Sequence, residues 1–202
     1  MRRVYLGLAL AAALWGVTFG LEPLNFWTEI SVATAAVAAY AVCCAREELM
    51  GLFNYRAGMI MAGVAGALLL YVIFVIGGWA SKAILPFAEN EITGIYELRG
   101  AAPRWVLILL LAGIIAPCEE IFWRGLVQSS FSFRFGEVRG WLLMAGAYAL
   151  VHIWAWNLML LGAALVCGLF WGFMVYRLKS LVPAIISHVL WDLAVFVFYP
   201  LQ

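Results

Sequence analysis

The chain has 202 residues, of which 67% are hydrophobic and only 11% are charged. This is more apolar surface than one water-soluble core can bury, so the composition predicts an all-α, polytopic bundle of transmembrane helices. The net charge of +1 offers no basic face to nucleic acid, and the lipid bilayer is the expected surrounding.

Seven apolar segments are each close to the length of about 20 residues that a membrane-spanning helix needs. The first follows Met1-Arg2-Arg3, and we expect it to be retained, because no small-x-small cleavage site followed by a soluble domain is present. The chain has neither an internal repeat nor a low-complexity linker, so we expect residues 1–202 to form a single transmembrane domain. The segments lie at approximately 4–20, 27–45, 58–80, 104–128, 140–156, 158–176 and 181–199.

Lysine and arginine are unevenly distributed between the two ends of these segments. With a cytoplasmic N-terminus, eight of them face the cytoplasm and three face the opposite side, and the positive-inside rule favours this orientation. We therefore expect a multi-pass protein of a prokaryotic plasma (inner) membrane. The eight are Arg2, Arg3, Arg46, Arg56, Arg134, Arg139, Arg177 and Lys179, and the three are Lys82, Arg99 and Arg104.

A small set of titratable side chains lies within the predicted spans. An ionisable group in a bilayer costs roughly 2.5 kcal/mol or more unless it is paired or hydrated, so each is a candidate for function. Counting about 1.5 Å per residue from the cytoplasmic ends, three segments bring such groups to a common depth of about 16 to 18 Å. Chance placement would not be expected to agree in this way. The set is Glu119, Glu120, Arg124, His152, His188 and Asp192.

Helical spacing gives the two adjacent glutamates different surroundings. Glu120 and Arg124 are four residues apart, so they share a helix face and can pair directly. Glu119 points about 100° away from Glu120 and can face a cavity instead. A desolvated carboxylate beside a like charge is suited to accept a proton, so Glu119 is the candidate general base.

Three short motifs occur in order on three predicted spans, with the patterns EExxxR, F/YxxxH and HxxxN or HxxxD. In this chain they read Glu119-Glu120-x-x-x-Arg124, Tyr148-x-x-x-His152 and His188-x-x-x-Asp192. Through these motifs, residues 103–199 resemble the CPBP family of intramembrane proteases, which groups CAAX prenyl endopeptidases of the second type with bacteriocin-processing and Abi-type immunity proteins. The first three segments add nothing specific to the resemblance.

The resemblance implies a role for each motif residue. Carried over by position, Glu119 is the general base, His152 is its partner on the attacking water, and His188 with Asp192 forms the oxyanion side. The family has asparagine as the oxyanion donor, and an ionised aspartate cannot donate a hydrogen bond. Asp192 must therefore be protonated or orient His188, and the spacing of four residues favours the second role.

The leading prediction is a glutamic-type intramembrane endopeptidase whose water-filled pocket opens toward the cytoplasmic half of the bilayer. Its substrate would be a membrane-associated or lipidated protein or peptide, and the resemblance implies no cofactor. The predicted catalytic residues are Glu119, His152, His188 and Asp192, and the supporting residues are Glu120, Arg124 and Tyr148.

Several alternatives stay open at this point. A catalytically silent family member would act as a membrane scaffold or immunity protein, and a proton-coupled carrier would use the buried groups as a relay. Cys118 would be a nucleophile with His152, although its apolar setting indicates an inert thiol. Two histidines with carboxylates would suit a zinc-dependent membrane protease, but HExxH is absent and Arg124 would oppose a cation.

Overall fold

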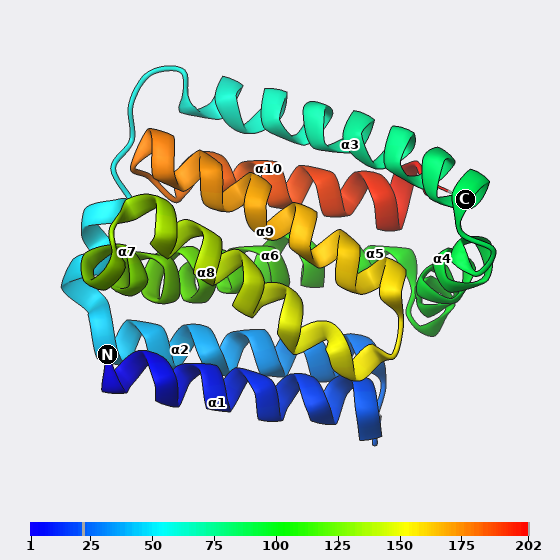
Figure 1. Ribbon diagram of the computed structural model, residues 1–202, viewed down its shortest axis with the longest axis horizontal. Helices are drawn as coiled ribbons and strands as arrows, with labels where there is room; N and C mark the ends of the chain where they lie inside the picture. The colour runs from blue at the N-terminus through cyan, green and yellow to red at the C-terminus, as the bar shows by residue number, and fades with distance from the viewer. Residues whose placement is uncertain (22, 202) are drawn as a thin grey trace.

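The computed structural model describes residues 1–21 and 23–201, and within them the chain is helical and contains no strand. Glu22, which we predicted to lie in the first loop, is outside the described residues. The helices lie side by side in one bundle (Figure 1). Their bounds are α1 (Arg2–Gly16), α2 (Phe26–Leu52), α3 (Met59–Ile84), α4 (Ala88–Glu97), α5 (Arg104–Leu110), α6 (Ala116–Glu120), α7 (Ser129–Phe135), α8 (Glu137–Leu150), α9 (Leu158–Leu178) and α10 (Val182–Asp192).

Six helices among the described residues are long and apolar enough to cross a membrane, and the seventh predicted segment forms a shorter apolar helix, Val182–Phe198. The prediction of an all-α polytopic bundle is confirmed. Several helices are longer than predicted because they continue beyond their apolar stretches and include charged residues such as Lys82 and Arg134. The six are Arg2–Leu21, Phe26–Leu52, Met59–Ile84, Arg104–Phe135, Glu137–Ala155 and Leu158–Leu178.

Wide π-helical turns interrupt the helices that carry the first and third motifs. The Arg104–Phe135 helix joins α5, α6 and α7 through π-helical turns at Leu111–Ile115 and Ile121–Gln128. The helix after α10 continues as a π-helical turn, Leu193–Phe198. A π-helical turn uses i to i+5 hydrogen bonds and is frequent at functional sites.

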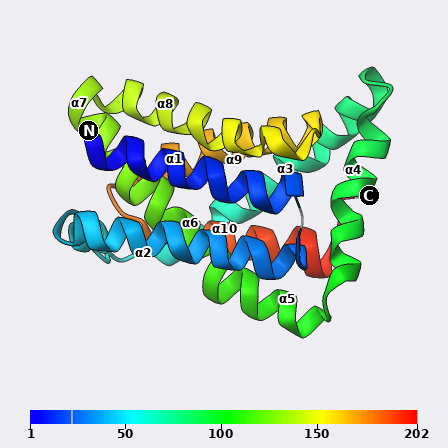
Figure 2. The same ribbon diagram turned by 90° about the horizontal axis from the view of Figure 1, so that it is seen from below.

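The bundle has two distinct ends. Figure 1 places the N-terminus, the α2–α3 connection and α7 at one end, which we call the N-terminal end. It places α4 and the C-terminus at the other end, which we call the α4 end. The α6 helix lies in the interior, where it contacts both α2 and α10 (Figures 1 and 2). Helix α3 packs along α10, and α8 packs along α9.

A tight turn between α8 and α9 ends the helix of the second motif. His152 lies in the 3-10 turn Val151–Ala155 that follows α8. Trp156 then takes a left-handed conformation with φ of 50°, and the side chain of Asn157 caps α9 by accepting a hydrogen bond from the Leu160 N–H at 2.7 Å. This turn fixes where α9 begins relative to His152.

Glycines allow the helices to approach closely on the N-terminal side of the motif residues. A methyl group added to Gly125 would overlap Leu49, and one added to Gly172 would overlap Trp141 and Met144. By contrast, a methyl group added to Gly162, on the same helix as Gly172, would meet no atom within 4 Å. At Gly125 and Gly172 the helices are therefore packed to contact distance.

Candidate active site

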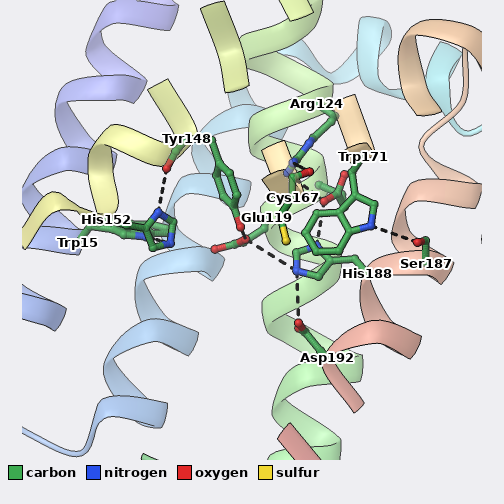
Figure 3. A network of polar contacts seen from close by, with 11 residues as sticks. Trp15, Glu119, Arg124, Tyr148, His152, Cys167, Trp171, Ser187, His188 and Asp192 are labelled. Atoms are coloured by element: carbon green, nitrogen blue, oxygen red, sulfur yellow. Dashed lines mark hydrogen bonds and ion pairs between the residues drawn. The ribbon is translucent and has the colours of Figure 1, made fainter. Parts of the chain in front are cut away.

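Glu119 and Glu120 are both buried on α6, but their side chains have different partners. The Tyr148 hydroxyl on α8 donates a hydrogen bond of 2.6 Å to Glu119 Oε2 (Figure 3). Arg124 Nη1 donates one of 3.0 Å to Glu120 Oε1. The predicted pairing of Glu120 with Arg124 is confirmed, and the arginine leaves Glu119 to other partners.

Arg124 is fully buried, and its charge is compensated on several sides. Besides Glu120, it donates a hydrogen bond of 3.2 Å from Nη2 to the Cys167 backbone carbonyl on α9. Its guanidinium lies 4.7 Å from the centre of the Tyr148 ring and 5.5 Å from that of Trp171. Aromatic faces stabilise a desolvated cation in this arrangement, so Arg124 ties α6, α8 and α9 together.

His188 on α10 is held by Glu120 and by an aromatic ring. Its Nδ1 lies 2.8 Å from Glu120 Oε1, and an ionised carboxylate can only accept, so Nδ1 carries the proton of this bond. The imidazole stacks on the Trp171 indole with ring centres 3.7 Å apart and planes inclined by 19°. The Trp171 N–H in turn donates to Ser187 Oγ at 3.1 Å. The imidazole is thereby fixed in position, and its Nε2 points away from Glu120, toward Asp192 and Glu119.

Asp192 faces the second nitrogen of His188. Its Oδ2 lies 3.6 Å from His188 Nε2, longer than a hydrogen bond, and Glu119 Oε2 lies 4.0 Å from the same nitrogen. Glu120 makes the hydrogen bond to Nδ1, which sequence spacing did not predict, and the role of Asp192 in orienting His188 stays a prediction. Spacing within α10 correctly placed Asp192 near the ring, but it carries no information on how the ring turns toward α6.

His152 is held through both ring nitrogens. Nδ1 lies 2.8 Å from the Tyr148 backbone carbonyl, which can only accept, so the proton is on Nδ1. The Trp15 indole N–H donates to Nε2 at 3.3 Å, which requires a lone pair there. The two contacts define a neutral imidazole of one tautomer. Trp15 is fully buried on α1, so the first segment contributes to the site although it carries none of the three motifs.

All four predicted catalytic residues line one cavity of about 140 Å³, which is large enough for several water molecules. Tyr148 also borders it, whereas Glu120 and Arg124 lie behind its wall. Cys118, the alternative nucleophile, does not line the cavity, although Cys167 does.

The cavity extends from the carboxylates toward the α4 end of the bundle. Its lining there includes Trp27 from the start of α2, Leu98 after α4, Ala163 from the start of α9 and Phe196 after α10. We predicted both a cytoplasmic N-terminus and a pocket that opens toward the cytoplasm. Because the cavity extends away from the N-terminal end, the two predictions cannot both be right.

Within residues 1–21 and 23–201, no group of three histidine, cysteine, aspartate or glutamate side chains is arranged to hold a metal ion. The carboxylates of the site instead surround His188. Glu120 contacts its Nδ1, and Asp192 and Glu119 lie at longer distance from its Nε2. The expectation of a cofactor-free site stays a prediction.

Fold and site together define a polytopic helical membrane protein with a buried cavity bordered by carboxylates and imidazoles. Residues 101–194 match the family described as Type II CAAX prenyl endopeptidase Rce1-like, a stretch that contains all three motifs. This part of the chain is similar to that protease family, as the motifs predicted. Comparisons with curated proteins and with solved structures gave no match.

Proposed function

We propose that the protein is a glutamic-type intramembrane endopeptidase that hydrolyses a peptide bond of a membrane-associated or lipidated protein or peptide. The observation that carries the proposal is the cavity, which Glu119, His152, His188 and Asp192 all border while Glu120 is bound by Arg124. A buried ionisable group that no partner neutralises is suited to proton transfer.

Glu119 would take the first proton. The Tyr148 hydroxyl holds Oε2, and no hydrogen bond from the described part of the chain occupies Oε1, which is therefore available to a water in the cavity. When the water loses its proton to Glu119, the remaining hydroxide forms a bond to the carbonyl carbon of the substrate. The C–N bond then breaks, and the proton on Glu119 passes to the leaving amine nitrogen.

His188 would stabilise the oxyanion formed during the attack. Its Nδ1 proton is committed to Glu120, so a donor at Nε2 requires the doubly protonated ring. The carboxylates of Glu120, Asp192 and Glu119 lie 2.8, 3.6 and 4.0 Å from its nitrogens and favour that cation. A fixed positive donor directed into a water-poor cavity is an effective oxyanion stabiliser.

His152 would be the second contact of the water. Because its proton is on Nδ1, Nε2 can only accept, and the attacking water can donate one proton toward Glu119 and the other toward this nitrogen. The water would then replace the bond from Trp15, which at 3.3 Å is longer than the other hydrogen bonds of the site.

The decisive experiment compares the purified wild type with Glu119→Gln and His152→Ala on membrane-anchored peptides, with the products identified by mass spectrometry. Loss of a general base typically lowers turnover by about 100- to 10,000-fold, and we expect Glu119→Gln to fall in this range. Glu137→Gln is the matched control, because Glu137 is exposed and pairs with Lys179 outside the cavity. Undiminished cleavage by both site variants would overturn the proposal.

A further inference from the structure

We propose that the substrate reaches Glu119 from the extracytoplasmic side, so that the peptide bond to be cut lies in an apolar segment at the outer half of the bilayer. This inference rests on the proposed peptidase function and adds the side of access and the class of substrate. It follows from the direction of the cavity, the closure behind it and the distribution of charge.

The cavity becomes more exposed with distance from the carboxylates. Near them its lining is buried, as at Ile115, Ala164 and Cys167. At the α4 end the lining residues Leu98 and Ala163 are partly exposed. A peptide can therefore approach from this end without displacing the buried interior.

The opposite direction is closed by close-packed side chains. Phe122, Trp123 and Val127 lie one to two turns beyond Glu119 toward the N-terminal end, and all are fully buried. Arg124 adds a buried charge whose pairing any passage would disrupt. A second hollow at this end, lined by Gln128 and Ser132 among others, shares no lining residue with the first. Access from the N-terminal end would require the core to come apart.

Charge distribution assigns the two ends to the two sides of the membrane. Eight lysine and arginine residues belong to the N-terminal end and three to the α4 end, so the N-terminal end is cytoplasmic by the positive-inside rule. The α4 end also carries Glu89 and Glu97, both exposed. The cavity therefore opens away from the cytoplasm.

The rim of the opening is a fixed strap formed by α4 and the turn Leu98–Ala101. The Trp27 indole N–H donates to the Leu98 carbonyl at 2.8 Å, and Arg99 Nε donates to the Phe196 carbonyl at 2.6 Å. At its other end, Glu91 Oε2 accepts from the Met159 N–H at 2.8 Å. The side chains that the strap and its neighbours direct into the opening are apolar, which fits an apolar residue beside the cut bond.

The test uses cysteine accessibility in the full-length protein. With the four native cysteines replaced by alanine, Leu98→Cys and Ala163→Cys each place one thiol at the opening. Ser132→Cys is the matched control, because Ser132 lines the second hollow at the N-terminal end. A membrane-impermeant maleimide should label the first two in intact cells and not in inverted vesicles, and Ser132→Cys should show the reverse. Labelling after denaturation verifies that each thiol is present.

The outcomes separate this inference from the proposed function, because labelling needs no catalysis and can be repeated with Glu119→Gln. Labelling of Leu98→Cys and Ala163→Cys only from the cytoplasmic side, or from neither side, would overturn the inference even if the wild type cleaves peptides. Outside labelling without any cleavage by the wild type would instead refute the peptidase and its substrate. Outside labelling together with cleavage of a segment anchored in the outer half supports both.

Discussion

The two ends of the bundle are built differently around the same motif helix. Toward the N-terminal end, glycines such as Gly125 and Gly172 bring the helices into close contact behind the motif residues. Toward the α4 end, the same helices diverge around a cavity that contains the titratable side chains. Glu119 and Glu120 are adjacent in sequence, but Glu119 borders the cavity and Glu120 is in the filled interior.

This difference indicates how a membrane protein can keep ionisable groups buried without neutralising all of them. Charges in the filled part are paired, as in Glu120 with Arg124, and their hydrogen bonds join three helices, the Arg104–Phe135 helix, α9 and α10. Charged groups at the cavity keep hydrogen-bonding atoms without a partner among the residues that the structure describes, and solvent or substrate can bind to these atoms. Substitutions in the filled part should therefore act on stability, and those at the cavity should act on catalysis.

The largest expected effect is on the filled side, at the Glu120–Arg124 pair. Arg124→Met leaves Glu120 buried without its main countercharge, and removal of one partner of a buried pair typically costs about 3 to 5 kcal/mol. We expect a large fall in the thermal unfolding midpoint in detergent. The double variant Glu120→Gln with Arg124→Met removes both charges and should recover part of the loss. Equal stability of Arg124→Met and wild type would contradict the division into a filled and an open side.

At the cavity, Tyr148→Phe should lower activity while leaving stability nearly unchanged. The variant removes the hydroxyl that donates to Glu119 Oε2. A hydrogen bond to a charged group contributes about 1.5 to 3 kcal/mol, so turnover should fall by roughly 10- to 100-fold. Parallel measurement of turnover and unfolding midpoint checks this prediction, and a variant that loses stability but keeps full turnover would contradict it.

A smaller effect on stability is expected at Gly172. A methyl group there would overlap Trp141 and Met144, and overpacking of this kind typically costs about 1 to 3 kcal/mol. Gly162→Ala is the control on the same helix α9, since its methyl group meets no neighbour. The unfolding midpoint should fall for Gly172→Ala and stay the same or rise for Gly162→Ala. Similar midpoints for the two variants would show that the packing around Gly172 accommodates an added methyl group without loss of stability.

The smallest expected effect concerns Trp15. Replacing this residue by benzothienylalanine exchanges the indole N–H for sulfur at nearly constant shape and frees His152 Nε2 for the water. Since a neutral hydrogen bond contributes about 0.5 to 1.5 kcal/mol, cleavage should rise by at most about tenfold. Steady-state kinetics would measure this, and a decrease would show that Trp15 orients His152 instead of competing with the water.

The sequence alone predicted the helices and the meeting of Glu119, His152, His188 and Asp192 at one place. Both predictions depend on properties of single helices, namely apolar length, spacing within a turn and depth from one end. The contact of Glu120 with His188 depends on how two helices are rotated about their axes, which periodicity does not determine. The direction of the cavity also depends on how the helices diverge, and no residue pattern encoded it.

Trp15 is different, because a signal for it was present. At about 1.5 Å per residue, it lies roughly 16 Å from the start of the first segment, the same depth as the motif residues. An indole N–H in the middle of an apolar span needs a partner, so the depth of Trp15 indicates a polar neighbour. The resemblance rests on motifs in the second half of the chain, and the first segment carries none of them.

The π-helical turn after Glu120 has a consequence for insertions and deletions in this family segment. A π-helical turn contains one residue more than an α-helical turn, so loss of one residue from Ile121–Gln128 would leave a regular α-helix. The extra residue is accommodated within the turn, so the residues on both sides of the deletion would keep nearly the same helix faces. Gln128, whose side chain donates to the Gly172 carbonyl at 2.9 Å, would still point toward α9. A segment that is one residue shorter in this turn can therefore keep both the two glutamates and the contacts of the filled end.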